Sequence, residues 1–338
     1  MTGVEGGAGS GATAQQAVLV TGGCGYIGSH TVRALHERGD AVVVLDDLSQ
    51  GFADALPSGV PLVHADVADR ARVATALRAH QVRAVLHFAG RIQVGESVRR
   101  PGDYFSANVG GTLALLQAMA DAGARHLVFS STAAIFGDPL KPRMDEDHPC
   151  APVNPYGRSK WLVEQMLPDF EAAHGIRSVC LRYFNAAGAW PDASIGERHQ
   201  PETHLIPLAI RAALGIGPAL SVFGDDWPTP DGTCVRDYVH VCDLADAHLR
   251  ALDHLRAGGQ SLRLNLGTGT GFSVRQVLNA VAQAVGRQVP HRVLGRRAGD
   301  PAVLVADATQ AGERLGWRPR FDEEAIVAHA LAWHRRDG

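Results

Sequence analysis

A glycine-rich turn directly after an apolar run constrains this fold more than any other feature of the chain. The run Ala17–Thr21 has the composition of a buried strand, and the segment Thr21–Gly28 leads from it into a predicted helix. Gly22, Gly25 and Gly28 fit the spacing G-x-x-G-x-x-G. Such a turn lets the backbone approach a pyrophosphate, which the free N–H groups and the positive end of the helix attract. The sequence therefore predicts a dinucleotide-binding strand–turn–helix unit.

Short β-branched runs alternate with helical stretches through the first half of the chain, a pattern typical of parallel strands joined by crossover helices. We therefore predict an α/β fold with a doubly wound parallel (Rossmann) sheet. The predicted strands are Ala17–Thr21, Ala41–Asp46, Pro61–Ala65, Ala84–Phe88, His126–Ser130 and Ser178–Arg182, and the predicted helices are Tyr26–Arg38, Ala71–His80, about Asn108 to Ala122, and Tyr156–His174.

After Asn185, Pro and Gly become frequent, which marks longer loops. We interpret residues 186–338 as a smaller mixed α/β lobe that binds the substrate, residues 17–185 as the dinucleotide-binding domain, and residues 1–16 as a disordered leader. Some strands and helices are expected to be exchanged between the two lobes. The elements predicted in the second half are His204–Leu214, Leu220–Phe223, Cys242–Leu255, Leu262–Leu266, Ser273–Val285 and Glu323–His334.

Charge and cysteine usage exclude several classes of protein. The net charge is −3 with no basic block, which argues against nucleic acid or an anionic membrane as a partner. No apolar run approaches the roughly 18 residues of a membrane span. Five widely spaced cysteines without a C-x-x-C indicate a reduced, cytoplasmic protein. The segment His240–Cys242 resembles a fragment of a metal site, but we find no second ligand cluster of suitable spacing, and we expect no metal.

An acid at the end of the second predicted strand favours one cofactor. Asp46 follows Gly28 by 18 residues, where a carboxylate accepts from the ribose hydroxyls of adenosine and repels a 2′-phosphate. Asp47 and Leu48 follow it, and no Arg lies nearby in the sequence. We therefore predict NAD rather than NADP. The other residues predicted at this carboxyl edge, each of which could also be a strand-end cap or packing residue, are Asp66, Val67, Phe88, Ala89 and Gly90.

Tyr156 and Lys160 are four residues apart and therefore share one face of a helix. An ammonium held beneath a phenol favours the phenolate, so the pair is expected to act as an acid and base at neutral pH. Thr132 closes the fifth predicted strand, where a hydroxyl can relay a proton to the phenol. A Tyr–Lys pair alone is a weak signal, but its position after a dinucleotide loop makes Thr132, Tyr156 and Lys160 the predicted catalytic residues.

This combination of hydroxyl, Tyr and Lys resembles the short-chain dehydrogenases/reductases, and the second lobe resembles their extended, nucleotide-sugar-modifying branch. The resemblance is closer still to the family of UDP-glucose (UDP-galactose) 4-epimerases, and it runs from about Val18 to about His334. The motifs that carry it are TGGCGYIGSHT (21–31), HFAG (87–90), VGES (94–97), SST (130–132), RYFN (182–185), VRDYVH (235–240) and RRAGD (296–300).

The resemblance implies reversible C4 epimerisation of a UDP-hexose through a 4-keto sugar, with tightly bound NAD and a homodimer formed through the helices Asn108–Ala122 and Tyr156–His174. The family roles carried over are NAD contacts by Tyr26, Ile27, Asp46, Asp66, Val67, Phe88 and Asn108, nicotinamide contacts by Tyr156, Lys160 and Phe184, and UDP-sugar contacts by Thr132, Asn185, His204, Leu205, Phe223, Arg236, Arg297 and Asp300. Arg236 could instead form a salt bridge with Asp237.

Other activities stay open or are disfavoured on particular residues. Leu304 stands where some family members carry Tyr beside the sugar's C2, so UDP-N-acetylglucosamine is a candidate substrate, as are UDP-pentoses and UDP-uronates. Dehydration is disfavoured, because Thr132 is followed by Ala133 and Ala134, which transfer no protons. A sugar-nucleotide dehydrogenase and a catalytically silent NAD-binding regulator are the remaining alternatives.

Overall fold

The computed structural model describes residues 16–297 and 300–336, so nearly all of the predicted leader and part of the RRAGD motif lie outside the described residues. Its main layer is a seven-stranded sheet in the order β11-β6-β5-β4-β1-β2-β3, and each of its pairings is parallel. The strand order reverses next to β1, which confirms the predicted doubly wound sheet. The strands are β1 (Val18–Thr21), β2 (Val42–Asp46), β3 (Leu62–His64), β4 (Ala84–His87), β5 (His126–Thr132), β6 (Arg177–Tyr183) and β11 (Leu262–Leu266).

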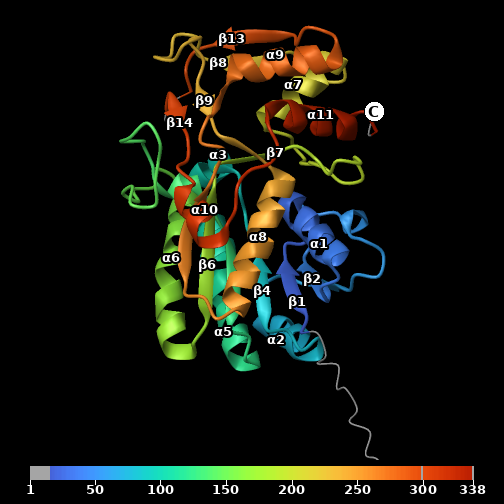
Figure 1. Ribbon diagram of the computed structural model, residues 1–338, viewed down its shortest axis with the longest axis vertical. Coiled ribbons are helices and arrows are strands. Elements are labelled where there is room, and N and C mark those ends of the chain that lie inside the picture. Colours follow the sequence, from blue (N-terminus) through green and yellow to red (C-terminus); the bar gives the residue numbers. More distant parts are fainter. Residues whose placement is uncertain (1–15, 298–299, 337–338) are drawn as a thin grey trace, which may run out of the picture.

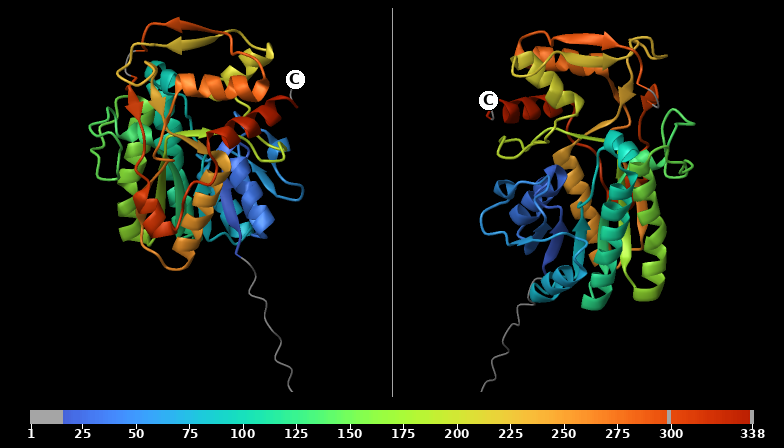
Figure 2. Two further views of the ribbon diagram at one scale, coloured as in Figure 1. Left: turned by 45° about the horizontal axis from the view of Figure 1, so that its top comes forward. Right: turned by 180° about the vertical axis from the view of Figure 1, so that it is seen from behind.

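Both faces of this sheet are covered by helices, as Figures 1 and 2 show. Neighbouring residues of a strand point to opposite faces, so Val18 and Val20 join one apolar core and Leu19 joins the other. Strands covered on both sides read as continuous apolar runs, and for this reason β1 is buried along its whole length. The first face carries α1 (Tyr26–Arg38), α8 (Val241–Arg256) and α10 (Thr309–Leu315), and the second carries α2 (Arg70–Ala79), α5 (Gly111–Ala122) and α6 (Pro155–His174).

A smaller lobe lies across the carboxyl ends of the strands, at the top of Figure 1. It has its own apolar core, formed mainly by three helices and one short strand, which pairs in parallel with a second, exposed strand. The elements of this lobe are α7 (Leu205–Leu214), α9 (Val274–Val285), α11 (Glu323–His334), β8 (Leu220–Phe223), β13 (His291–Leu294), the sheet of β12 (Phe272–Ser273), β9 (Val235–Arg236) and β14 (Val303–Leu304), and the pair β10 (Tyr238–His240) and β7 (Asn185–Ala187).

Elements from the second half of the chain also complete the main layer. β11 pairs with β6 at the edge of the large sheet, while α8 and α10 pack on its first face. The exchange between lobes that the sequence suggested is therefore present, whereas the exact division between residues 185 and 186 remains a prediction. None of the helices within residues 16–297 and 300–336 is both long and apolar enough to cross a membrane.

The helix expected to start near Asn108 begins earlier, and this expectation was wrong. After α3 (Val94–Arg99), a continuous helical segment runs through α4 (Pro101–Tyr104), a π-helical stretch (Phe105–Gly110) and α5. The sequence shows no 3.6-residue apolar pattern just before position 108, because residues 105–110 are π-helical and do not keep that period. The π stretch places Asn108 between the loop after β4 and α6.

Candidate active site

The turn between β1 and α1 admits only glycine at two of its positions. Gly22 has a φ of +71°, and a Cβ there would lie 2.5 Å from the backbone nitrogen of Ala89. A Cβ on Gly28 would lie 2.1 Å from the carbonyl oxygen of Gly22. α1 starts at Tyr26 with neither a side-chain cap nor an acid in its first turn, so its N–H groups and positive dipole face an anion unopposed. The turn therefore forms a cradle that fits a pyrophosphate.

Asp46 ends β2 at the same edge of the sheet. Its carboxylate accepts hydrogen bonds from the backbone N–H of Cys24 (2.9 Å) and of Leu48 (2.8 Å), one on each oxygen. Burial raises the pKa of this carboxyl group. Because each oxygen keeps a further lone pair, the fixed carboxylate can still accept from the two hydroxyls of a ribose. The geometry fits the adenosine half of NAD.

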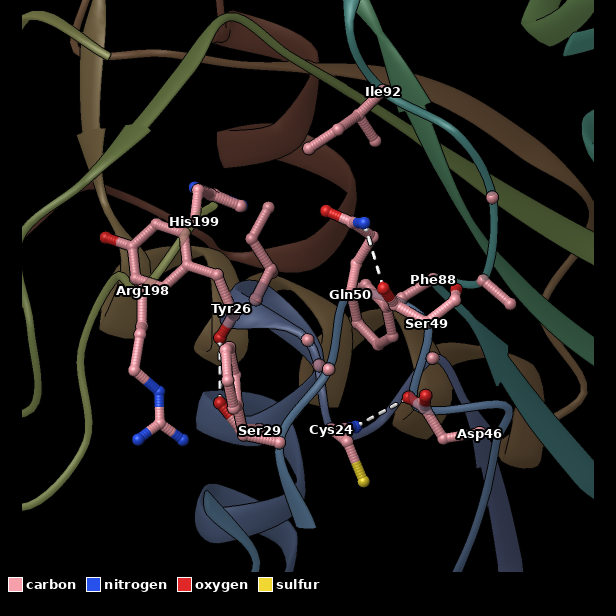
Figure 3. Close-up of a pocket in the computed structure, with 18 of the residues that line it drawn as sticks. Cys24, Tyr26, Ser29, Asp46, Ser49, Gln50, Phe88, Ile92, Arg198 and His199 are labelled. Atoms are coloured by element: carbon pink, nitrogen blue, oxygen red, sulfur yellow. Dashed lines mark hydrogen bonds between the residues drawn. The ribbon is translucent and has the colours of Figure 1, made fainter. Parts of the chain in front are cut away.

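A cavity of about 660 Å³ opens between the carboxyl edge of the sheet and the smaller lobe, a volume typical of cofactor sites. Figure 3 shows Asp46 and Phe88 on one side of it and Tyr26, Arg198 and His199 on the other. The predicted cofactor residues that line it are Gly22, Gly25, Tyr26, Ile27, Gly28, Asp46, Asp47, Asp66, Val67, Phe88, Ala89, Gly90, Tyr156 and Lys160.

Three predicted cofactor residues, Leu48, Asn108 and Phe184, are not among the residues lining the cavity, and their contact with NAD remains a prediction. Asn108 is engaged within the protein. Its Oδ1 accepts from the N–H of Arg91 (2.7 Å), and its Nδ2 donates to the carbonyl of Arg91 (3.1 Å) and to Oγ of Ser159 (2.8 Å). Asn108 therefore ties the loop after β4 to α6 and holds that wall of the cavity in place.

Local sequence fixes the start of α6 and so the position of Tyr156. The Asn154 side chain caps the helix by accepting from the N–H of Gly157 (2.8 Å), and Pro155 occupies the first turn. One turn later, Nζ of Lys160 donates to the carbonyl of Ser130 on β5 (2.9 Å). Lys160 is only 3% exposed, and this burial lowers its pKa to about 8.

The pKa of Tyr156 departs from our expectation. We expected Lys160 to favour the phenolate, but burial raises the pKa of Tyr156 above its ordinary value, and a hydrogen bond with Thr132 opposes that rise only in part. Desolvation of the phenolate therefore outweighs the hydrogen bond with Thr132, and Lys160 does not reverse the direction of the shift. Tyr156 is a neutral phenol at neutral pH in this environment.

The three consecutive hydroxyls that end β5 have different partners. Ser130 shares a short hydrogen bond with the hydroxyl of Tyr183. Ser131 donates to Oε1 of Glu164 (2.5 Å). Thr132 is the one of the three that is bonded to Tyr156. The structure thus brings Thr132, Tyr156 and Lys160 together, as the sequence predicted.

Most of the predicted substrate residues gather on the smaller lobe. The guanidinium of Arg297 lies 4.2 Å from the ring centroid of Phe223, and Nη2 of Arg236 lies 3.8 Å from Oδ1 of Asp300. Leu304 on β14 is in register with Arg236 on β9. Two cations, an aromatic ring and a carboxylate therefore gather on β8, β9 and the connection between β13 and β14, as the binding of a nucleoside diphosphate requires.

The alternative partner for Arg236 is not supported. Asp237 instead accepts hydrogen bonds from the backbone N–H groups of Thr268 (2.8 Å), Gly269 (3.1 Å) and Ala306 (3.1 Å). Nη1 of Arg236 donates to the carbonyl of Pro301 (2.9 Å). Asp237 thus anchors loops, and the Arg236 guanidinium is directed towards Asp300.

The remaining predicted substrate residues lie on the connection between the lobes. Nδ2 of Asn185 donates to the carbonyl of Asp237 (2.9 Å), which joins β7 to β10. Leu205 begins α7 and packs against the core of the smaller lobe. His204 precedes it and lines the large cavity.

Sequence reasoning missed one wall of the cavity. The segment from Ser194 to Pro201 lines it, and Glu197, Arg198 and His199 belong to this segment. The run of two acids and two histidines between Glu197 and His204 was a signal that could have identified it. By contrast, His240 has a structural role, because its Nδ1 accepts from the N–H of Cys242 (3.0 Å) and its Nε2 lies 3.0 Å from Nδ1 of His329.

Comparison with known sequences shows that this chain is similar to UDP-glucose 4-epimerases. Residues 18–267 match the model of the NAD dependent epimerase/dehydratase family. The chain is 52% identical over 319 residues to a UDP-glucose 4-epimerase of Azospirillum brasilense, covering 94% of this chain and 92% of that protein. It is likewise 52% identical over 319 residues to a UDP-glucose 4-epimerase of Rhizobium meliloti, covering 94% and 97%.

Solved structures show the same similarity. The UDP-glucose 4-epimerase from Brucella ovis, in complex with NAD, is 46% identical and superposes with a TM-score of 0.92 over 94% of this chain and 97% of that one. The UDP-glucose 4-epimerase from Bifidobacterium longum, in complex with NAD⁺ and UDP, is 36% identical and gives a TM-score of 0.90 over 95% and 99% of the two chains.

Proposed function

The chain belongs to the NAD dependent epimerase/dehydratase family, and from this premise we propose that Tyr156, Lys160 and Thr132 perform the proton chemistry of a sugar-nucleotide epimerase. The protein catalyses the reversible C4 epimerisation of a UDP-hexose, between UDP-glucose and UDP-galactose, with NAD as its cofactor. The observation that carries the assignment of roles is that Tyr156 and Lys160 line the same cavity as the glycine cradle and Asp46.

The residues of the carboxyl edge fit NAD. In our proposal the turn around Gly22 and Gly25 holds the pyrophosphate, Asp46 holds the adenosine ribose, and Phe88 to Gly90 face the nicotinamide half. Bound NAD would supply a reversible hydride acceptor for C4 of the sugar. Tight retention of the cofactor is required, because the reaction has no net redox change.

Tyr156 exchanges the proton of the sugar's 4-hydroxyl. Its raised pKa keeps the phenol protonated at neutral pH, so it is ready to donate, and it needs help to accept. Lys160, with a pKa of about 8, carries its positive charge at neutral pH and stabilises the phenolate form of Tyr156. That phenolate accepts the proton of the 4-hydroxyl when C4 is oxidised, and the phenol so formed returns it when C4 is reduced. Thr132 is bonded to Tyr156 and can relay the proton to the sugar oxygen.

The smaller lobe is proposed to fix the nucleotide while the sugar turns. Arg236 and Arg297 bind the diphosphate, Phe223 packs on the uracil ring, and Asp300 accepts from a ribose hydroxyl. Asn185 and His204 are assigned to the sugar side of the site. A firm grip on UDP with a loose grip on the hexose suits the reaction, because a rigidly held hexose could not present its other face.

We also propose a homodimer and a cytoplasmic location. Leu113 on α5 is 38% exposed and Leu162 on α6 is 44% exposed, so both helices present apolar side chains outside the core. A four-helix contact between two copies would cover them. All five cysteines lie within the described residues and are free thiols, which supports a reducing compartment.

The function is tested by incubating the purified full chain with UDP-galactose without added cofactor and identifying the product sugar. We expect UDP-glucose, because NAD stays bound through purification. Formation of a sugar acid with a requirement for added NAD would indicate a dehydrogenase and contradict the proposal. A Tyr156→Phe variant serves as the control for contaminating epimerase from the host.

A further inference from the structure

Two acids and two histidines converge in the connection between β7 and α7. One ligand atom from each of Glu197, His199, Glu202 and His204 lies within 4.8 Å of the other three. Nδ1 of His199 is 3.0 Å and Nδ1 of His204 is 2.7 Å from the same Oε1 of Glu197. Nδ1 of His204 is also 3.2 Å from Oε1 of Glu202. Both imidazoles therefore direct the same ring nitrogen into one small volume.

Three of the four side chains of this cluster are largely enclosed, which separates it from ordinary acidic surface. The Glu197 and Glu202 side chains are each 4% exposed and that of His199 is 17% exposed, whereas that of His204 is 45% exposed. Two buried carboxylates in one site are costly unless cations compensate them. With the carboxylates ionised, one protonated imidazole leaves the cluster with a negative charge, whereas a divalent ion with two neutral imidazoles balances it.

The cluster is also held in place by its surroundings. Oε1 of Glu202 accepts from the backbone N–H groups of Thr203 (2.7 Å) and His204 (2.8 Å), which fixes the direction of that carboxylate. Nε1 of Trp333 on α11 donates to the carbonyl of Glu197 (2.9 Å). Such outer contacts orient ligands before a metal arrives.

We propose that Glu197, His199, Glu202 and His204 bind a zinc ion at the rim of the cofactor cavity. Two imidazole nitrogens and two carboxylate oxygens suit Zn²⁺, which takes four such ligands in a tetrahedron at about 2.0–2.2 Å. Tetrahedral ligands at those bond lengths are roughly 3.3 Å apart. Three of the ligand pairs are 2.7–3.2 Å apart and lie close to that value, and the other pairs, which are within 4.8 Å, would draw together on binding the ion. Hard cations such as Mg²⁺ and Ca²⁺ prefer sites made of oxygen alone.

The site lies beside the cofactor cradle. Glu197, His199 and His204 line the same cavity as Tyr26, and the rings of Tyr26 and His199 meet edge to face with centroids 6.1 Å apart. Figure 3 shows His199 and Tyr26 on the same side of the cavity. A zinc ion would connect this wall of the cavity to the start of α7.

The experiment is a calorimetric titration of the full chain with ZnCl₂ after treatment with EDTA and desalting. We expect one zinc ion per chain. The His199→Gln/Glu197→Gln double variant should bind at least about 100-fold more weakly, since loss of outer contacts alone costs 10–100-fold. His36→Gln, which changes an exposed histidine on α1, should bind like the wild type. The Tm of the wild type, but not of the double variant, should rise with zinc.

Zinc binding by the wild type that is no tighter than that of the double variant would overturn the proposal and leave a hydrogen-bonded His–Glu cluster. Because the double variant could fold poorly, Glu202→Gln provides a milder test, as its amide oxygen still accepts from the backbone. It should weaken zinc binding while matching the Tm of wild type in EDTA. Epimerisation of UDP-galactose is measured separately, so failure of the zinc site and failure of the proposed function are distinguishable.

Discussion

A buried ion pair behind the active-site helix allows a stability prediction of defined size. Glu164 lies one turn beyond Lys160 on α6, and its Oε2 accepts from Nη2 of Arg182 on β6 at 2.7 Å. The side chains of Glu164 and Arg182 are 0% and 3% exposed. A Glu164→Gln substitution keeps the shape and the acceptor for Ser131, but it leaves the guanidinium buried without its counter-ion.

Breaking one partner of a buried pair costs about 3–5 kcal/mol. Unfolding entropy of about 2.1 cal/mol/K per residue amounts to about 0.7 kcal/mol/K for a chain of this length, so Glu164→Gln should lower the Tm by about 4–7 °C. Differential scanning calorimetry of the NAD-loaded protein measures this shift. Urea denaturation gives the corresponding change in the free energy of unfolding.

Two further variants decide whether the reasoning holds. Glu164→Met combined with Arg182→Met removes both charges, and it should be destabilised by only about 1–2 kcal/mol, chiefly because Ser131 loses its acceptor. Asp121→Asn breaks an exposed pair with Arg70 and should change stability by about 0.5 kcal/mol or less. If the double Met variant is as unstable as Glu164→Gln, burial of an unpaired charge is not the cause.

Three other outcomes follow from the site. Tyr156→Phe should lower kcat for UDP-galactose by about 10²–10⁴-fold, because it removes the group that exchanges the proton, and near-full turnover in a coupled assay would reject that role. Lys160→Met should raise stability at about pH 7 by about 3 kcal/mol, because the folded pKa of about 8 lies about 2.5 units below the ordinary value of 10.5 and the buried charge is unfavourable. Between about pH 8 and pH 10.5 the unfolded chain keeps a proton on Lys160 that the folded chain has lost, so the stability of the wild type rises with pH across that window. The difference in free energy of unfolding between the variant and the wild type, measured by urea denaturation, should therefore shrink from about pH 7 to about pH 10, and a constant difference would contradict this. Leu304→Tyr should reduce turnover of UDP-N-acetylglucosamine while leaving that of UDP-glucose within about threefold, because the larger ring fills space beside β9; a wild type that excludes the acetylated sugar altogether would refute the proposed space.

Much of the fold could be predicted because its signals are local. The bounds predicted for Tyr26–Arg38, Leu262–Leu266 and Glu323–His334 agree with those of α1, β11 and α11. α1 ends at Gly39 in the left-handed conformation, and the Asp322 side chain caps α11, so each boundary is set by a residue next to it. The alternation of strand and helix then left few topologies to consider.

The contributions that the sequence did not reveal come from residues far apart along the chain. The hydroxyl of Tyr26 donates to the carbonyl of Gly188 (2.6 Å), and Arg198 stacks on Phe52 across the cavity. No periodic pattern in the sequence predicts that the segment around Arg198 lies at that position. The pKa of Tyr156 was predicted in the wrong direction for the same reason. Desolvation depends on all the atoms that pack around the phenol, whereas the four-residue spacing in the sequence indicates only that Lys160 is near.

Tyr156, Lys160 and Glu164 occupy successive turns on one face of α6, and this arrangement links the proton chemistry to the stability of the fold. A carboxylate one turn from an ammonium would ordinarily pair with it and reduce its field elsewhere. Here Glu164 is engaged by Arg182 and Ser131, and Lys160 donates to a neutral carbonyl instead. The positive charge of Lys160 therefore stays uncompensated beside Tyr156, which is the condition for stabilising a phenolate whose own burial disfavours it. The ion pair behind the helix thus keeps a competing carboxylate away from the ammonium on which the proposed mechanism depends.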